Sequence, residues 1–445
     1  MPFHRRLACK LNYFQSIILM FAAVILIGAA LLMLPISAQE RTVTPFHEAL
    51  FTATSAVCVT GLVVRDTASH WSAFGQAVLM VLIQIGGLGV ITVGASFSLL
   101  SGRRISLSQR GRMQEAMSAP KVGGIVRLTG FVIRTSLMIE GIGALCMLPV
   151  FCRDFGVSGI WKAVFHSVSA FCNAGFDLMG TPDMPFVSLT AYRADPVINL
   201  TISALIVVGG IGFLTWDDVR TNRLCFHRYR LQSKVILAAT ALLILLPMLY
   251  FFCFEFKGGA LRERLLLSLF QSVTPRTAGF NTADYTSLSS SGRGLTILLM
   301  FIGGSPGSTA GGIKTTTIAV LVANAFAVFR RQKSPEMFGR RMEEKAVHDA
   351  AAIFTLYLVL SLTGAFTIST VEGLPLSECL FETTSAIATV GLSLGLTPHL
   401  GIVSQGILIF LMFIGRVGGL TMIYAALSGS KSSVARLPQE RITVG

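Results

Sequence analysis

Four glycine-containing tracts recur along this sequence of 445 residues and share one layout. In each tract a phenylalanine is followed four positions later by serine or threonine, and a glycine stands nine or ten positions after the phenylalanine. The pairs are Phe51 and Gly61, Phe165 and Gly175, Phe270 and Gly279, and Phe381 and Gly391. The glycines are spaced by 114, 104 and 112 residues. Repetition of this kind indicates one structural unit that is present four times.

The chemistry open to such tracts is coordination of a cation by main-chain oxygen. A hydrated cation cannot enter hydrocarbon, so a pore must replace its water, and four loops around one axis can do so with backbone carbonyls. The backbone path that turns successive carbonyls inward is partly strained and tolerates glycine best. A short helix that ends beside each loop would direct its negative end toward the centre. Potassium-channel filters carry Thr-Val-Gly-Tyr-Gly in four copies, whereas each copy here retains one glycine.

A second glycine-rich segment is predicted to interrupt a membrane span. Residues 303–312 read Gly-Gly-Ser-Pro-Gly-Ser-Thr-Ala-Gly-Gly, and such a run cannot continue a stable helix. Backbone freed at membrane depth needs water or protein partners, so we expect this segment inside the pore, just below the four loops. Its likeness to a phosphate-binding G-x-x-x-x-G-K-[ST] motif is superficial, because Ile313 separates Gly312 from Lys314. We therefore do not expect a nucleotide site.

The composition places these tracts in a membrane protein. Hydrophobic residues make up 53% of the chain, charged residues 13%, and the mean hydropathy is +0.69. Soluble proteins carry roughly a quarter charged residues, so a soluble multidomain enzyme and a disordered chain are excluded. The 8 cysteines are scattered without a C-x-x-C pair and are expected to be packing residues. No span carries paired aspartates, His-Glu-x-x-His or a Ser-His constellation, so the chain is not expected to be an enzyme.

Eight apolar stretches are long enough to cross the hydrocarbon, which takes roughly 20 residues. They lie at 13–34, 71–100, 126–151, 197–215, 234–256, 294–329, 346–370 and 399–428. Shorter elements near 45–57, 158–171, 262–275 and 374–387 are expected to be re-entrant. The predicted fold is an all-α integral membrane protein. It has four tandem span–pore-helix–loop–span repeats in a pseudo-fourfold arrangement around one central ion pore.

The basic residues predict the orientation and the boundaries. The predicted order is a cytoplasmic tail (1–12), repeat 1 (13–100), a loop (101–125), repeat 2 (126–215), a loop (216–233), repeat 3 (234–329), a loop (330–345), repeat 4 (346–428) and a tail (429–445). The tails and these loops, with the second loop counted to residue 234, hold 22 Lys and Arg, against ten on the opposite side. Both termini and the three loops are therefore predicted to be cytoplasmic. The opposite, outward-facing mouth holds most of the acids and would concentrate cations.

The tandem loops, the Thr-Pro-Arg-Thr-Ala-Gly-Phe-Asn-Thr stretch (274–282) and the stretch 304–315 resemble the Trk/Ktr/HKT superfamily of potassium transporters. Because the chain begins directly with a repeat, it looks most like the bacterial KtrB-type membrane subunit. The resemblance implies ion-binding filter residues at Val59, Thr60, Gly61, Asn173, Ala174, Gly175, Thr277, Ala278, Gly279, Thr389, Val390 and Gly391. In this superfamily serine at the first filter glycine accompanies sodium selectivity, so four glycines favour K+ as the ion held by the backbone carbonyls.

The same resemblance implies that the interrupted segment is an intramembrane gate loop. Its residues would include Gly303, Gly304, Gly307, Ser308, Thr309, Gly311, Gly312 and Lys314, opposed by Arg416 from the last span. A fixed charge below the filter raises the barrier to a cation. Lys314 is expected either to contact the loop or a carboxylate, or to extend toward the cytoplasmic surface.

Three further polar residues lie in or near the predicted spans. Arg134 and Glu140 are six positions apart, which does not place them on one clean helical face. Function and packing between repeats both remain open for this pair. His166, in the second short element, is expected to pack or to form hydrogen bonds rather than to bind a metal.

The predicted function is a pore-forming subunit of a potassium uptake system in the bacterial plasma membrane, where lipid surrounds it. The alternative is a sodium-coupled or sodium-selective secondary transporter, since transporters also use repeats and broken helices. We expect K+ as the transported ion, with Na+ left open, no organic cofactor and no nucleic-acid partner. The resemblance implies a homodimer regulated by a cytosolic ring of nucleotide-binding RCK subunits.

Overall fold

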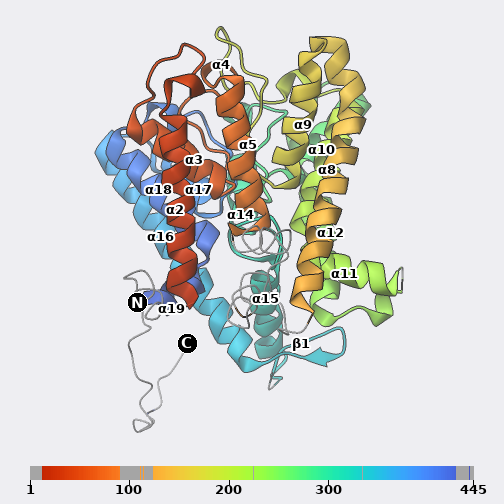
Figure 1. Cartoon of the computed structure of the whole chain (residues 1–445). Coiled ribbons are helices and arrows are strands. Elements are labelled where there is room, and N and C mark those ends of the chain that lie inside the picture. The colour runs from red at the N-terminus through yellow and green to blue at the C-terminus, as the bar shows by residue number, and fades with distance from the viewer. Residues whose placement is uncertain are drawn as a thin grey trace.

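The chain folds almost entirely into helices (Figure 1). This computed structural model describes residues 13–90, 111, 114, 124–223, 225–332, 334–426 and 440. The predicted tail 1–12, the end of repeat 1 at 91–100, most of the loop 101–125, and the tail 429–445 apart from residue 440 lie outside the described residues. The all-α class is confirmed. The one strand pair in the described part is a small hairpin of β1 (Glu336–Met337) and β2 (Arg340–Arg341).

Among the described residues, four long helices are apolar enough to cross a membrane. They are α2 (Tyr13–Leu32), α8 (Ile125–Phe155), α12 (Leu231–Tyr250, continued by a π-helical turn at Phe251–Glu255) and α16 (Glu344–Glu372). Large apolar side chains on their outer faces are exposed, among them Leu26, Leu145 and Leu245. Exposed apolar faces of this length match a surrounding of lipid rather than water.

A short helix follows each long helix along the chain. The four short helices are α3 (Phe46–Val57), α9 (Ser158–Phe171), α13 (Leu261–Val273) and α17 (Leu376–Ile387). Their bounds agree within a few residues with the short elements expected from the sequence. The phenylalanine of each repeated tract lies within its short helix and is fully buried. At 12 to 14 residues these helices are too short to cross the hydrocarbon.

The segments expected as even-numbered spans are short or broken helices. They are α5 (Ala73–Leu88), α10 with α11 (Pro196–Gly210 and Phe213–Asn222), α14 with α15 (Ser290–Phe301 and Thr315–Phe329), and α18 with α19 (Ile402–Val417 and Gly419–Ala426). Only the sixth span was expected to be interrupted. The structure also bends the chain by 95° between α10 and α11, where Gly212 has a φ of 91°. A left-handed residue cannot continue a right-handed helix.

Contacts between distant segments close the molecule. α19 packs on α2, and the Gln15 side chain donates to the carbonyl of Ala425, so the first and last described helices lie side by side. α15 and the hairpin lie together at the end of the molecule opposite α4 (Thr67–His70) (Figure 1). Short single turns complete the described chain at Pro35–Ser37, Thr190–Tyr192, Phe226–Arg228, Tyr285–Ser287 and Thr397–His399.

Candidate functional site

The four repeated glycines lie next to one another in space. A Cβ atom built on Gly61 would lie 2.5 Å from the carbonyl oxygen of Ala174, and one on Gly175 would lie 2.7 Å from that of Ala278. A Cβ on Gly279 would lie 2.6 Å from the carbonyl oxygen of Val390, and one on Gly391 would lie 2.0 Å from that of Thr60. Each loop therefore abuts the main chain of the next, and the fourth returns to the first. Main-chain oxygens of four segments far apart in sequence thus form a closed ring, which we call the carbonyl ring.

The backbone of the four loops has the same unusual conformation. The glycines have φ values of 94°, 70°, 79° and 89°, and the residue two positions before each glycine is also left-handed. These residues are Val59, Asn173, Thr277 and Thr389, with φ between 52° and 70°. Positive φ is an outlier for β-branched residues and costs about 1–3 kcal/mol at each position. At three of the four positions residue type gave no sign of it, because valine and threonine do not favour this conformation, whereas asparagine tolerates it.

Each loop begins where a short helix ends, as expected. The helices α3, α9, α13 and α17 end at Val57, Phe171, Val273 and Ile387, three to five residues before the ring oxygens. The carbonyl ends of helices carry partial negative charge. Four such ends beside one ring favour a cation at its centre.

Buried hydroxyl groups attach each loop to its own short helix. The amide groups of Gly61 and Gly391 each donate to the hydroxyl of Ser55 and Ser385, both at 3.0 Å. Ser169 donates to the carbonyl of Phe176 at 2.7 Å, and Thr274 donates to that of Phe280. In the sequence these serine and threonine residues served only as marks of the repeat and were assigned no structural role. Their recurrence four positions after the phenylalanine of every tract was the available signal of that role.

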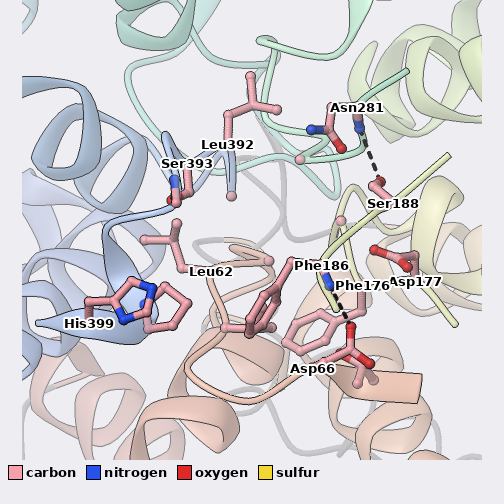
Figure 2. A pocket seen from close by; sticks show the side chains of 18 residues that line it. Leu62, Asp66, Phe176, Asp177, Phe186, Ser188, Asn281, Leu392, Ser393 and His399 are labelled. Carbon is pink, nitrogen blue, oxygen red and sulfur yellow. Dashed lines mark hydrogen bonds between the residues drawn. The ribbon is translucent and has the colours of Figure 1, made fainter. Parts of the chain in front are cut away.

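A cavity of about 310 Å³ opens on one side of the ring (Figure 2). The four glycines are among its lining residues. Figure 2 shows Asp66 and Asp177 on one side of the cavity and Ser393 and His399 on the other. Asp66 accepts from the amide of Phe186 at 3.0 Å and is thereby fixed at the cavity wall. Burial raises the pKa of the Asp177 carboxyl to about 6, so this group carries negative charge at neutral pH. The cavity thus presents carboxylates to an approaching cation.

The glycine-rich segment 303–312 joins α14 to α15 as an irregular loop and contacts the second repeat. The Ser305 amide donates to the carbonyl of Gly210 at 2.9 Å, and the Phe213 amide donates to that of Gly307 at 2.7 Å. The hydroxyl of Thr309 donates to the carbonyl of Phe171, at the end of α9, at 3.1 Å. Backbone groups left unpaired by the helix break are therefore bonded to neighbouring segments, as burial requires.

The same segment lies directly against the loops that form the carbonyl ring. A Cβ on Gly311 would lie 2.0 Å from the Thr389 hydroxyl, and one on Gly312 would lie 2.7 Å from the carbonyl oxygen of Ala388. A Cβ on Gly303 would lie 3.3 Å from the Thr277 side chain. Only glycine allows this close approach. The segment therefore lies on the side of the ring opposite to the cavity.

Both cations expected near this segment bond to its main chain. Arg416, from α18, donates to the carbonyls of Thr309 and Gly86, and to that of Gly87 at 3.2 Å. Lys314 donates to the carbonyl of Ala310 at 2.7 Å and to that of Gly311 at 3.4 Å. Of the alternatives expected for Lys314, the structure shows that its side chain contacts the loop. Arg416 connects the segment to α5 in the first repeat, a long-range contact that sequence spacing does not indicate.

Other polar residues have hydrogen-bonding roles. His166 is buried: its Nδ1 bonds to the carbonyl of Lys162 at 2.7 Å, and its Nε2 accepts from the amide of Leu178 at 3.3 Å. The expectation of a hydrogen-bonding histidine is confirmed. Glu140 accepts from the Gln84 side chain at 3.0 Å, and no ion pair within the described residues joins it to Arg134.

Arg276 is a buried cation that the sequence reasoning did not single out. It lies just after α13 and donates to the Thr240 hydroxyl of α12 at 3.2 Å. A positive charge at the carbonyl end of a helix is favourable. The sequence signal for Arg276 was its position inside the third tract, in which the glycine follows the phenylalanine by nine positions rather than ten.

Comparison with known proteins identifies the family. Residues 8–434 match the TrkH family model, described as a cation transport protein. The potassium/sodium uptake protein NtpJ of Enterococcus hirae is 40% identical over 99% of each chain. The Ktr system potassium uptake protein B of Bacillus subtilis is also 40% identical, over 97% of this chain and 96% of its own.

A solved structure shows the same fold. The crystal structure of the potassium transporter TrkH from Vibrio parahaemolyticus aligns with a TM-score of 0.74 at 17% identity. The alignment covers 92% of this chain and 83% of that one.

Proposed function

Because the chain belongs to the TrkH family of cation transport proteins, which are not enzymes, we propose that it is the pore-forming membrane subunit of a potassium uptake system. Four repeats surround one axis in this proposal, and K+ passes through the carbonyl ring. Two relatives of high identity are named as potassium uptake proteins. The observation that carries the proposal is the closed ring of main-chain oxygens from Thr60, Ala174, Ala278 and Val390.

The ion-binding residues of the filter are the three residues that end at each repeated glycine. In each loop the first and the third of these residues have positive φ and the middle one does not, a backbone path that supports carbonyls turned toward one side. Carbonyl oxygens held in this way replace the hydration shell of K+. The helix ends of α3, α9, α13 and α17 add negative potential at the ring.

The segment 303–312 is the gate of the proposed pathway. Support comes from its close packing beneath the loops and from the bonds that Arg416 and Lys314 make to its carbonyls. These bonds hold two positive charges near the pathway, and a fixed positive charge opposes the passage of K+. Conduction requires the segment and Arg416 to separate.

The cavity with Asp66 and Asp177 is the outer mouth in this proposal, and both termini are cytoplasmic. The described basic residues of the segment 330–345, which includes the hairpin, then face the cytoplasm, in line with the bias of membrane proteins. A cytosolic nucleotide-binding RCK ring would dock on this face of a homodimer. The word "system" in the name of the Bacillus relative is consistent with more than one subunit.

A sodium-selective or sodium-coupled transporter is the second candidate. The printed name of the Enterococcus relative includes sodium as well as potassium. Glycine at all four repeated positions favours K+ as the main ion. Conductance in planar bilayers separates the candidates, because a pore turns over much faster than an alternating-access transporter.

Potassium-limited growth of an uptake-deficient bacterium tests the proposal. Cells that express the wild-type chain should grow, whereas cells with Gly175→Ser or Gly279→Ser should not. Each serine adds a side chain where a Cβ alone would lie 2.7 or 2.6 Å from a ring oxygen. Equal growth of all three strains would contradict the filter assignment, and failure of the wild type would contradict potassium uptake.

A further inference from the structure

A second hydrogen-bond system holds the outer part of the filter loops, and it differs among the repeats. In every tract the residue after the phenylalanine is polar and buried; the four are Thr52, His166, Gln271 and Glu382. In the three later repeats this side chain reaches the stretch of loop that begins three residues after the glycine. An apolar side chain could be buried at this position without the desolvation cost that a polar group carries. The contacts of the four side chains with their loops must therefore explain why they are polar.

Glu382 makes the most extensive contacts of the four. Its Oε1 accepts from the Ser393 hydroxyl at 2.7 Å and from the Leu394 amide at 2.9 Å, and its Oε2 accepts from the Thr397 hydroxyl at 2.6 Å. All three donors belong to the loop segment that follows Gly391. Movement of this segment would leave the buried Glu382 carboxyl without partners, which is more unfavourable than the loss of a neutral hydrogen bond.

The second and third repeats use different side chains in the same place. His166 accepts from the Leu178 amide at 3.3 Å while its Nδ1 bonds to its own helix, so the neutral ring holds a fixed orientation. Gln271 lies 3.5 Å from the Thr282 hydroxyl and accepts from the hydroxyl of Tyr285. Leu178, Thr282 and Leu394 each stand three residues after the glycine of their loop.

The first repeat lacks this support. Thr52 donates to the carbonyl of Glu48 in its own helix at 2.9 Å and does not bond to its loop. The outer part of the first loop is held instead by a bidentate ion pair at 2.9 Å between Arg65, which is 51% exposed, and Glu48 of the same short helix, which is 13% exposed. Asp66 adds bonds from the amides of Ser69 and Phe186. The first loop is thus held through groups other than the residue that follows its phenylalanine.

We propose that Glu382, Gln271 and His166 are positioning residues that determine ion discrimination by fixing the outer ends of three filter loops. This inference rests on the proposed potassium pathway. A carbonyl ring that is free to contract can surround the smaller Na+, whereas a ring held at fixed width favours K+. The three residues act through the loops and do not touch the ion.

The test compares Glu382→Ala, Glu382→Gln and Thr52→Ala in full-length protein reconstituted in liposomes, measuring the KM for K+ and the inhibition by Na+. Glu382→Ala should reduce the ratio of K+ to Na+ preference about tenfold, the effect of one hydrogen bond to a charged group. Glu382→Gln should stay within about threefold, because its amide oxygen accepts from Leu394 and its amide nitrogen donates to Thr397. Thr52→Ala, the matched control, should stay within about twofold, because Thr52 bonds only to its own helix.

Gln271→Leu provides a second variant of similar volume if Glu382→Ala does not fold, with an expected loss of about threefold. Unchanged discrimination in whichever of these two variants folds, or an equal loss in Thr52→Ala, would overturn the inference while the proposed function stands. A rescue by Glu382→Gln, with Thr52→Ala normal, would support it. Wild-type liposomes that take up no K+ would overturn the proposed function and this inference together.

Discussion

The filter loops and the intramembrane segment 303–312 are held in different ways. Each filter loop is bonded to its own short helix by groups a few residues away, such as Ser55 with Gly61 and Ser385 with Gly391. The intramembrane segment is held mainly by residues from other repeats, among them Phe171 and Arg416, and within its own repeat by Lys314. Local bonds preserve a loop when the repeats shift, whereas bonds between repeats break. This difference supports the proposal of a rigid filter and a movable gate.

The largest expected effect is at the ring itself. Gly391→Ala forces a left-handed alanine and places its Cβ 2.0 Å from the carbonyl oxygen of Thr60. We expect the rate of K+ uptake to fall at least about 100-fold. The control is Gly406→Ala, because Gly406 lies within α18 with open space around its Cβ position. Rubidium uptake by liposomes measures both; similar rates in the two variants would count against the rigid ring.

Arg416→Ala tests the gate half of the comparison. It removes the bonds to Thr309 and Gly86 together with the positive charge, so the segment is released. We expect K+ flux to rise about tenfold and discrimination against Na+ to weaken. Arg416→Lys keeps the positive charge but has fewer hydrogen-bond donors. Its K+ flux should lie between that of the wild type and that of Arg416→Ala. Flux that is unchanged or lower at equal expression would contradict a gating role.

The smallest effect concerns the cavity rather than the ring. The Asp177 carboxyl, with its pKa of about 6, is negative above that pH and neutral below it. Lowering the external pH from 7.5 to 5 should therefore reduce uptake at limiting K+ about twofold, since Asp177 is one of several charges that attract the cation to the cavity and does not bind it in the ring. Asp177→Asn should show low uptake at both pH values. An equally steep pH profile in this variant would assign the effect to other groups.

Much of the fold could be predicted because it depends on local patterns. The long apolar stretches predicted the long helices, and the shorter apolar elements predicted the short helices. The short helix α9 (Ser158–Phe171) has the expected bounds. The tract glycines were found because a repeated period is visible in one sequence. The closed contact of Gly61 with Ala174 and of Gly391 with Thr60 is a tertiary feature that no single tract contains.

The parts that could not be predicted depend on residue types that do not indicate their conformation. Val59 and Thr389 are left-handed although β-branched residues avoid this region, so packing overrides their preference. The bend at Gly212 was missed because a glycine inside an apolar run is compatible with a helix. The bond from Arg416 to Gly86 joins residues 330 positions apart, which sequence spacing cannot indicate.

The most direct test of the central claim is a crystal structure of the full chain in Tl+, which replaces K+ and scatters anomalously. The account predicts anomalous density on the axis of the carbonyl ring, within ligand distance of the oxygens of Thr60, Ala174, Ala278 and Val390. In crystals of Gly391→Ala the same anomalous density should be lost. Strong Tl+ density elsewhere in the protein, with none at the ring of the wild-type chain, would contradict the account.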